Sequence, residues 1–129
     1  MIKVNNIQYL VGNKKILKDI YTPYEKIVCE FLNDLSLSLI KDKKAKLFSD
    51  VMSFAFWCRK NNIETLKKTL NENYLRLGLG LIFHISPSNV PINFAYTFAF
   101  GLLSGNSNIV RVPSQKFDQV NIICDVVKY

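Results

Sequence analysis

The sequence predicts an α/β protein in which N-terminal helices precede a β-α-β-α unit. Two observations carry this prediction. Apolar residues recur at helical spacing before residue 77, whereas residues 78–110 contain no Asp, Glu, Lys or Arg. Pro, Gly and Asn divide that charge-free stretch into short apolar segments, the pattern of buried parallel strands joined by a helix. We therefore divide the chain into a mainly helical segment, 1–77, and a β-α-β-α segment, 78–129.

The N-terminal segment is expected to hold three helices. The first spans 23–40, where an apolar residue recurs at every fourth position. The second spans 47–58, and Asn62 is expected to cap the third. Before these helices, residues 2–11 alternate weakly between apolar and polar side chains, which predicts a short hairpin or an edge strand.

The second segment is expected to form a strand, a buried helix, a second strand and a final helix, over 79–85, 92–103, 108–112 and 117–127. Gly105-Asn106 supplies a left-handed end to the buried helix. Because the first strand is apolar throughout, we expect both of its faces to be buried. A right-handed crossover makes the two strands parallel neighbours. Two such strands leave an unpaired edge, so we expect an incomplete domain that needs either the rest of the domain or a homo-oligomer.

Composition excludes several classes of protein. The net charge is +7, and 14 of the 17 basic side chains lie before residue 78. These lysines are scattered, so we interpret them as a solvated helix surface rather than a nucleic-acid site. The three cysteines have no metal-ligand spacing, and an odd count without a signal peptide indicates a cytoplasmic protein. The charge-free stretch is broken into pieces shorter than the ~20 residues of a membrane span.

Polar residues that follow the two strands are the candidate site. Asn89 comes just after the first strand. Ser86 and Ser88 precede it, and the prolines on either side of it restrict the turn. Its side-chain amide can donate a hydrogen bond to a developing oxyanion. The alternative, which spacing alone favours, is that Asn89 or Ser88 merely caps the following helix.

Arg111 ends the second strand beside Ser114 and Gln115, and this grouping can hold a phosphate or a ribose. A plain surface arginine is the equal alternative. His84 is the single histidine, and its apolar strand predicts a hydrogen-bonded core residue rather than a catalytic one. No metal site is predicted.

Three segments together resemble the aldehyde dehydrogenase superfamily, namely 80–91, Ser104-Gly105-Asn106 and 110–115. In that superfamily a strand ends in Pro-x-Asn-x-Pro, a helix ends in Gly-Asn, and a strand ends in Lys-Pro-Ser-Glu. The Asn-Val-Pro and Val-Pro-Ser forms found here are most similar to LuxC-like acyl-CoA reductases. The resemblance implies a Rossmann-type cofactor domain and NADPH-dependent reduction of a fatty acyl-CoA, or an acyl carrier thioester, to an aldehyde.

The resemblance also implies roles for individual residues. Asn89 corresponds to the amide that stabilises the thiohemiacetal oxyanion. The first turn is expected to lie along the nicotinamide ribose and pyrophosphate of NADP(H), and the second to contact the adenosine ribose. The first turn comprises Ile85, Ser86, Pro87 and Ser88, and the second comprises Val112, Pro113, Ser114 and Gln115.

Two departures from the family pattern bear on the cofactor. Val112 replaces the lysine, and Arg111 cannot simply substitute for it because adjacent strand residues point to opposite faces. Gln115 replaces the glutamate, which removes a charge that would repel a 2′-phosphate and so favours NADP over NAD.

None of the three cysteines matches the family nucleophile, which lies downstream of these motifs. We therefore expect the N-terminal part of a reductase, inactive alone. The alternatives are a non-enzymatic binding or assembly module, or the remnant of a decayed gene.

Overall fold

The computed structural model describes residues 7–70 and 72–128, and it confirms the predicted order of elements. The N-terminal part holds α1 (Lys26–Lys41), the short 3-10 helix η1 (Ala45–Leu47), α2 (Ser49–Trp57) and α3 (Lys60–Lys68). The second part holds β1 (Leu81–Ile85), α4 (Asn93–Leu103), β2 (Ser107–Arg111) and α5 (Asp118–Val127). Of the predicted hairpin over 2–11, residues 7–11 form no strand, and the others lie outside the described residues.

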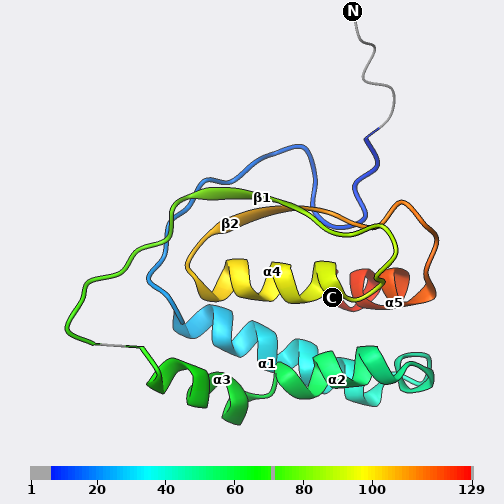
Figure 1. Cartoon of the computed structure of the whole chain (residues 1–129), viewed down its shortest axis with the longest axis horizontal. Helices are drawn as coiled ribbons and strands as arrows, with labels where there is room; N and C mark the ends of the chain where they lie inside the picture. The colour runs from blue at the N-terminus through cyan, green and yellow to red at the C-terminus, as the bar shows by residue number, and fades with distance from the viewer. Residues whose placement is uncertain (1–6, 71, 129) are drawn as a thin grey trace, which may run out of the picture.

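The elements stack in layers, with α4 in the middle (Figure 1). The two strands lie on one side of α4 and contact it, while α1 contacts α4 and α5 from the other side. Helices α2 and α3 pack on α1. The helix predicted as buried over 92–103 therefore lies between the sheet and α1.

The two strands are parallel, as the crossover rule predicts, and pair from Leu81 opposite Ser107 to Ile85 opposite Arg111. Because parallel partners in register point to the same face, Ile82 and His84 lie on one face with Asn108 and Val110. These four side chains are half-buried, and α4 covers their face.

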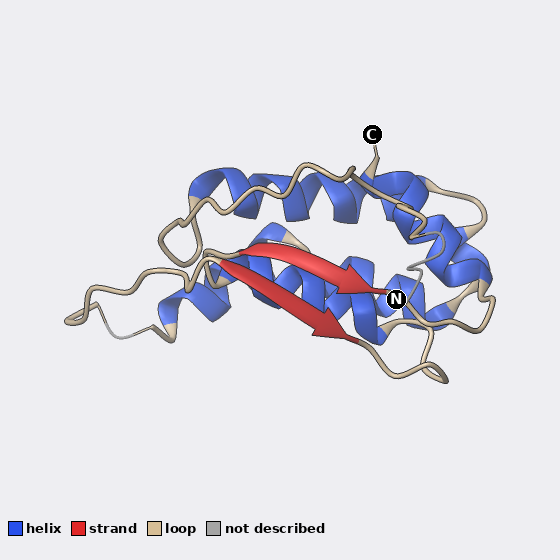
Figure 2. Cartoon of the chain, turned by 90° about the horizontal axis from the view of Figure 1, so that it is seen from above, coloured by secondary structure: helices blue, strands red, loops and turns tan. Residues whose placement is uncertain are grey.

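The prediction that both faces of the first strand are buried is wrong within the described chain. Leu81, Phe83 and Ile85 are 38%, 59% and 68% exposed. Figure 2 shows the strands in front of the helices, with no helix over this outer face. An apolar strand of a parallel sheet needs cover on both sides, and the described residues supply it on one side only.

One hydrophobic core joins the two segments of the chain. Phe54 of α2 is fully buried and packs edge-on against Tyr96 of α4, with ring centroids 5.0 Å apart. The fully or almost fully buried side chains come from both segments and include Leu32, Leu39, Val51, Ile63, Ala99, Leu103 and Ile123. The predicted division at residue 77 is therefore a division along the sequence, since both parts contribute to the same interior.

Local signals predicted one turn correctly and one helix cap wrongly. Gly105 ends α4 with φ +83°, and its carbonyl accepts a 3.0 Å hydrogen bond from the Tyr21 amide. Helix α3, in contrast, begins at Lys60 with no side-chain cap. Asn62 instead donates a 2.6 Å hydrogen bond from its side-chain amide to the carbonyl of Trp57, so it secures the end of α2.

Helices long and apolar enough to cross a membrane are absent from residues 7–70 and 72–128.

Candidate functional site

The two predicted turns leave the same edge of the sheet. Ile85 and Arg111 are register partners at the carboxyl ends of β1 and β2. Residues 86–92 continue from the first strand and 112–117 from the second. The parallel pairing therefore gathers the predicted site residues at one edge, which is where open α/β sheets bind their ligands.

Asn89 is exposed in a turn four residues before α4 begins. The residue that precedes α4 is Ile92, and no side chain caps this helix. The alternative that Asn89 or Ser88 acts as a helix cap is therefore wrong. Since the Asn89 amide makes no hydrogen bond with the described residues, it is free to donate to a ligand at the sheet edge.

Ser86 is the unusual residue of the first turn. It is 7% exposed, and its hydroxyl has no hydrogen-bond partner among residues 7–70 and 72–128. A buried hydroxyl without a partner costs ~1–3 kcal/mol, so such groups are rare unless a ligand satisfies them. The resemblance predicts Ser86 as a contact to the cofactor, and the structure shows that its hydroxyl is buried with no partner among the described residues.

The second turn matches the expected geometry of its strand. Arg111 is exposed on the outer face, whereas Val112 is half-buried and packs against the core. The two side chains thus lie on opposite faces, as strand alternation predicts. Pro113 is buried and anchors the turn, and Ser114 and Gln115 are exposed beyond it.

A network of polar side chains lies beneath the sheet, and the sequence predicted only the hydrogen bond of His84. His84 Nε2 lies 2.7 Å from Asn108 Oδ1, and the Asn108 amide donates to the carbonyl of Asn106 over 2.8 Å. The Asn106 side chain in turn accepts from the Leu79 amide at 2.6 Å. His84 is therefore hydrogen-bonded, as predicted, but it is half-buried beneath the sheet and does not belong to the core. The role of Asn106 and Asn108 was missed because it depends on strand register.

Gly101 of α4 permits this network, because a Cβ at that position would collide with the side chain of Asn108. The helix can approach the polar pair only because it carries hydrogen at this point of contact.

The three cysteines are free thiols. Burial raises the pKa of the Cys58 thiol to about 12 and that of Cys124 to about 11. Burial also raises the pKa of Cys29 above its usual value. Because the thiolate is the nucleophile in thioester chemistry, these thiols are poor candidates for it.

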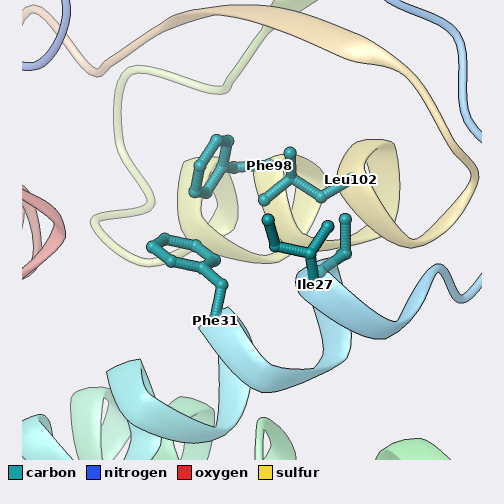
Figure 3. A pocket seen from close by; sticks show the side chains of 5 residues that line it. Ile27, Phe31, Phe98 and Leu102 are labelled. Carbon is teal, nitrogen blue, oxygen red and sulfur yellow. The ribbon is translucent and has the colours of Figure 1, made fainter.

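An apolar groove of about 310 Å³ lies between α1 and α4 (Figure 3). Its lining consists of Ile27, Val28, Phe31, Phe98 and Leu102. No residue of the two predicted turns lines it, and it offers no polar group to a reaction.

The described part of the chain contains no group of His, Cys, Asp and Glu side chains that could hold a metal ion.

These features define a mixed α/β protein whose parallel β-α-β-α unit presents two turns at one sheet edge. The family model described as "Acyl-CoA reductase (LuxC)" matches residues 21–124. The chain therefore belongs to the LuxC acyl-CoA reductase family, as the resemblance of its motifs implied. Enzymes of this family act on acyl-CoA and use NAD(P)H. Searches of curated proteins and of solved structures gave no match.

Proposed function

We propose that this chain forms the first part of the cofactor-binding domain of an NADPH-dependent acyl-CoA reductase. In this proposal the turn after β1 contacts the nicotinamide half of NADP(H), and the turn after β2 contacts the adenosine half. Asn89 donates a hydrogen bond to the oxyanion that forms from the acyl thioester. The observation that carries the proposal is the position of Asn89, whose exposed side chain lies in the turn at the carboxyl end of a parallel β-α-β unit.

The buried Ser86 hydroxyl supports a ligand at the first turn. A ribose hydroxyl or a pyrophosphate oxygen would accept the hydrogen bond that Ser86 makes with no described residue. The amides that open α4 favour a negative group nearby. When bound, the cofactor supplies the hydride, and the chain's own residues orient it.

The charges of the second turn favour NADP(H), the form of the cofactor that carries a 2′-phosphate. Residues 111–117 include Arg111 and Lys116 but no carboxylate. A 2′-phosphate meets attraction there, whereas the glutamate of the family pattern would repel it.

The raised pKa values of the buried cysteines support the proposal that the chain is inactive alone. Burial keeps Cys58 and Cys124 protonated at neutral pH, because their pKa values lie at about 12 and about 11. Acyl transfer needs a thiolate, so Cys58 and Cys124 are poor candidates for the nucleophile of the proposed reductase.

Nucleotide binding can be tested on the chain by NMR titration with NADPH and, separately, NADH. We expect shifts of the amide signals at residues 85–86, 88–90, 112 and 114–116 that saturate at lower NADPH than NADH. Ser86→Ala should weaken the binding of NADPH by about tenfold, the value of a hydrogen bond worth ~1.4 kcal/mol. Ser104→Ala, which removes an exposed hydroxyl at the other end of α4, is the matched control.

Activity is tested by adding a fatty acyl-CoA and NADPH to the same preparation. No oxidation of NADPH is expected. Turnover by the pure chain would refute the assignment of the nucleophile, and shifts confined to other surfaces would refute the cofactor site.

A further inference from the structure

Residues 11–20 form an exposed loop that extends from the body of the protein. Each of these ten residues is exposed, and a Cβ at Gly12 would meet no atom of the described residues within 4 Å. In Figure 1 the loop belongs to the blue segment that runs above β1, on the side of the molecule away from α2 and α3. The loop precedes residues 21–124, which the family model matches. It therefore lies outside the region on which the family assignment rests.

Both ends of the loop are attached to the body. Leu10, immediately before it, packs against the hydrophobic core. At the other end, the Ser107 hydroxyl donates a 3.0 Å hydrogen bond to the carbonyl of Asp19. Ser107 is the first residue of β2, so this attachment lies at the opposite end of the sheet from the turns assigned to the cofactor. Residues 11–18 are thus held at both ends while their side chains face solvent.

The centre of the loop places two aliphatic side chains between lysines. Its sequence is Lys14-Lys15-Ile16-Leu17-Lys18. Ile16 and Leu17 are 52% and 56% exposed. The three lysine side chains form no ion pair within residues 7–70 and 72–128. Since these lysines do not lie on a helix, the solvated helix surface inferred for the basic residues does not account for them.

The composition of the loop fits a partner surface that is both apolar and anionic. Asp19 is its single acidic residue, so three lysines minus one aspartate leave the loop with a net charge of +2. Aliphatic side chains gain free energy on leaving water, and lysines can bury their methylene stems while the ammonium groups stay at a charged surface. A lipid surface accepts an exposed aliphatic pair without a matching pocket, whereas a protein partner needs one.

We propose that residues 11–20 bind the surface of a bilayer that contains anionic lipids. The aliphatic pair enters the boundary between headgroups and acyl chains, and the three lysines contact the lipid phosphates. Apolar insertion and lysine attraction are each weak alone, and together they give reversible membrane binding. The proposal does not depend on the cofactor site, because the loop is attached at the other end of the sheet.

Co-sedimentation of the whole chain with lipid vesicles tests the electrostatic part. We expect binding to vesicles of equimolar phosphatidylcholine and phosphatidylserine, and little binding to pure phosphatidylcholine. The variant Lys15→Gln/Lys18→Gln should bind the mixed vesicles about 25-fold more weakly, since each lysine near an anionic surface contributes about fivefold. Lys43→Gln/Lys44→Gln is the matched control, because it removes the same charge from exposed positions outside the loop. The control should retain most of the binding.

The variant Ile16→Ser/Leu17→Ser tests the apolar part without changing the charge. We expect its binding to the mixed vesicles to weaken by about tenfold or more, because two aliphatic side chains no longer leave water. Leu75→Ser/Leu79→Ser is the matched control, since these leucines are 88% and 87% exposed and lie outside the loop. It should leave the binding unchanged.

The variant Leu17→Trp measures insertion directly. Its added fluorescence should be quenched by lipids that are brominated along their acyl chains, whereas that of Leu47→Trp, at an exposed position on η1, should not. The native Trp57 contributes equally to both variants.

Three results would each overturn the proposal: no binding to the mixed vesicles, equal binding to the two kinds of vesicle, or equal losses in the loop variants and their controls. Binding of polyglutamate that matches the mixed vesicles in affinity and is unaffected by Ile16→Ser/Leu17→Ser would also overturn it, and would indicate an acidic protein partner. Nucleotide shifts at Ser86 are measured without lipid, so failure of this proposal is distinct from failure of the cofactor site.

Discussion

At the scale of single residues, two glycines separate the cost of backbone strain from the cost of close contact. Gly105 and Gly12 both have positive φ, at +83° and +73°. A Cβ at Gly105 would collide with the carbonyl of Tyr21, whereas a Cβ at Gly12 would meet nothing within 4 Å. The turn at Gly105 therefore needs glycine for its positive φ and for the lack of space for a Cβ. The turn at Gly12 needs it for the positive φ alone.

We predict that Gly105→Ala lowers the free energy of unfolding more than Gly12→Ala does. Strain in the left-handed region costs ~1–2 kcal/mol at either position. The collision at Gly105 adds a further ~1–3 kcal/mol because main-chain atoms must move. Urea denaturation of both variants measures the difference, and equal losses would contradict the contact between Gly105 and Tyr21.

Asn89 and Ser86 show what residue-level reasoning reached and what it missed. The spacing of prolines and serines predicted the turn and placed Asn89 in it. Helix capping was favoured by spacing alone, but α4 begins four residues later, so Asn89 does not cap it. The burial of the Ser86 hydroxyl without a partner could not be predicted, because it depends on the elements that surround the turn.

At the scale of elements, a buried hydroxyl joins the first two helices. Ser36 of α1 is fully buried and donates a 2.6 Å hydrogen bond to the carbonyl of Ala55. Ala55 lies in the last turn of α2, where carbonyls have no partner within their own helix. Ser36 thus satisfies the end of a neighbouring helix inside the core.

Replacing Ser36 by alanine should lower the free energy of unfolding by ~1–3 kcal/mol, because the Ala55 carbonyl would remain buried and unpaired. Ser38→Ala on the exposed side of the same helix is the control and should change stability by less than ~0.5 kcal/mol. Thermal denaturation followed by circular dichroism compares them. Similar midpoints for the two variants would argue against the hydrogen bond between Ser36 and Ala55.

The strands show how far element prediction extends. Their positions, order and parallel direction followed from apolar runs, turn residues and the handedness of crossovers. Whether the outer face of the sheet is covered did not follow from the sequence, because an apolar run in β1 looks the same whether or not a helix covers it. Phe83 and Ile85 are exposed because no helix of the described residues packs on that face of the sheet.

At the scale of the whole molecule, the two sequence segments depend on one interior. Helix α1 contacts both α4 and α5, and Ile123 of α5 is only 2% exposed. Since small domains with a single core unfold cooperatively, the N-terminal helices and the β-α-β-α unit should unfold together.

We predict that Ile123→Ala, in the second segment, shifts the unfolding of the first segment as well. The loss is expected to be ~2–5 kcal/mol, the usual cost of emptying a buried isoleucine site. Fluorescence of Trp57 reports on α2, and far-ultraviolet circular dichroism reports on all helices. Both transitions should move by the same amount, and the exposed Ile27→Ala should move neither appreciably. Separate transitions would show that the two segments are independent domains.

The sequence by itself determined the order of helices and strands, the left-handed end of α4 at Gly105, the hydrogen-bonded state of His84 and the membership of the LuxC family. These properties depend on local periodicity, turn chemistry and motifs, which are all written along the chain. Only the tertiary structure decided that Asn62 secures α2, that the buried Ser86 hydroxyl has no partner among the described residues, and that the leucines of residues 75–79 face solvent. Each of these depends on which distant segments meet, and contacts between distant segments leave no periodic signal in the sequence.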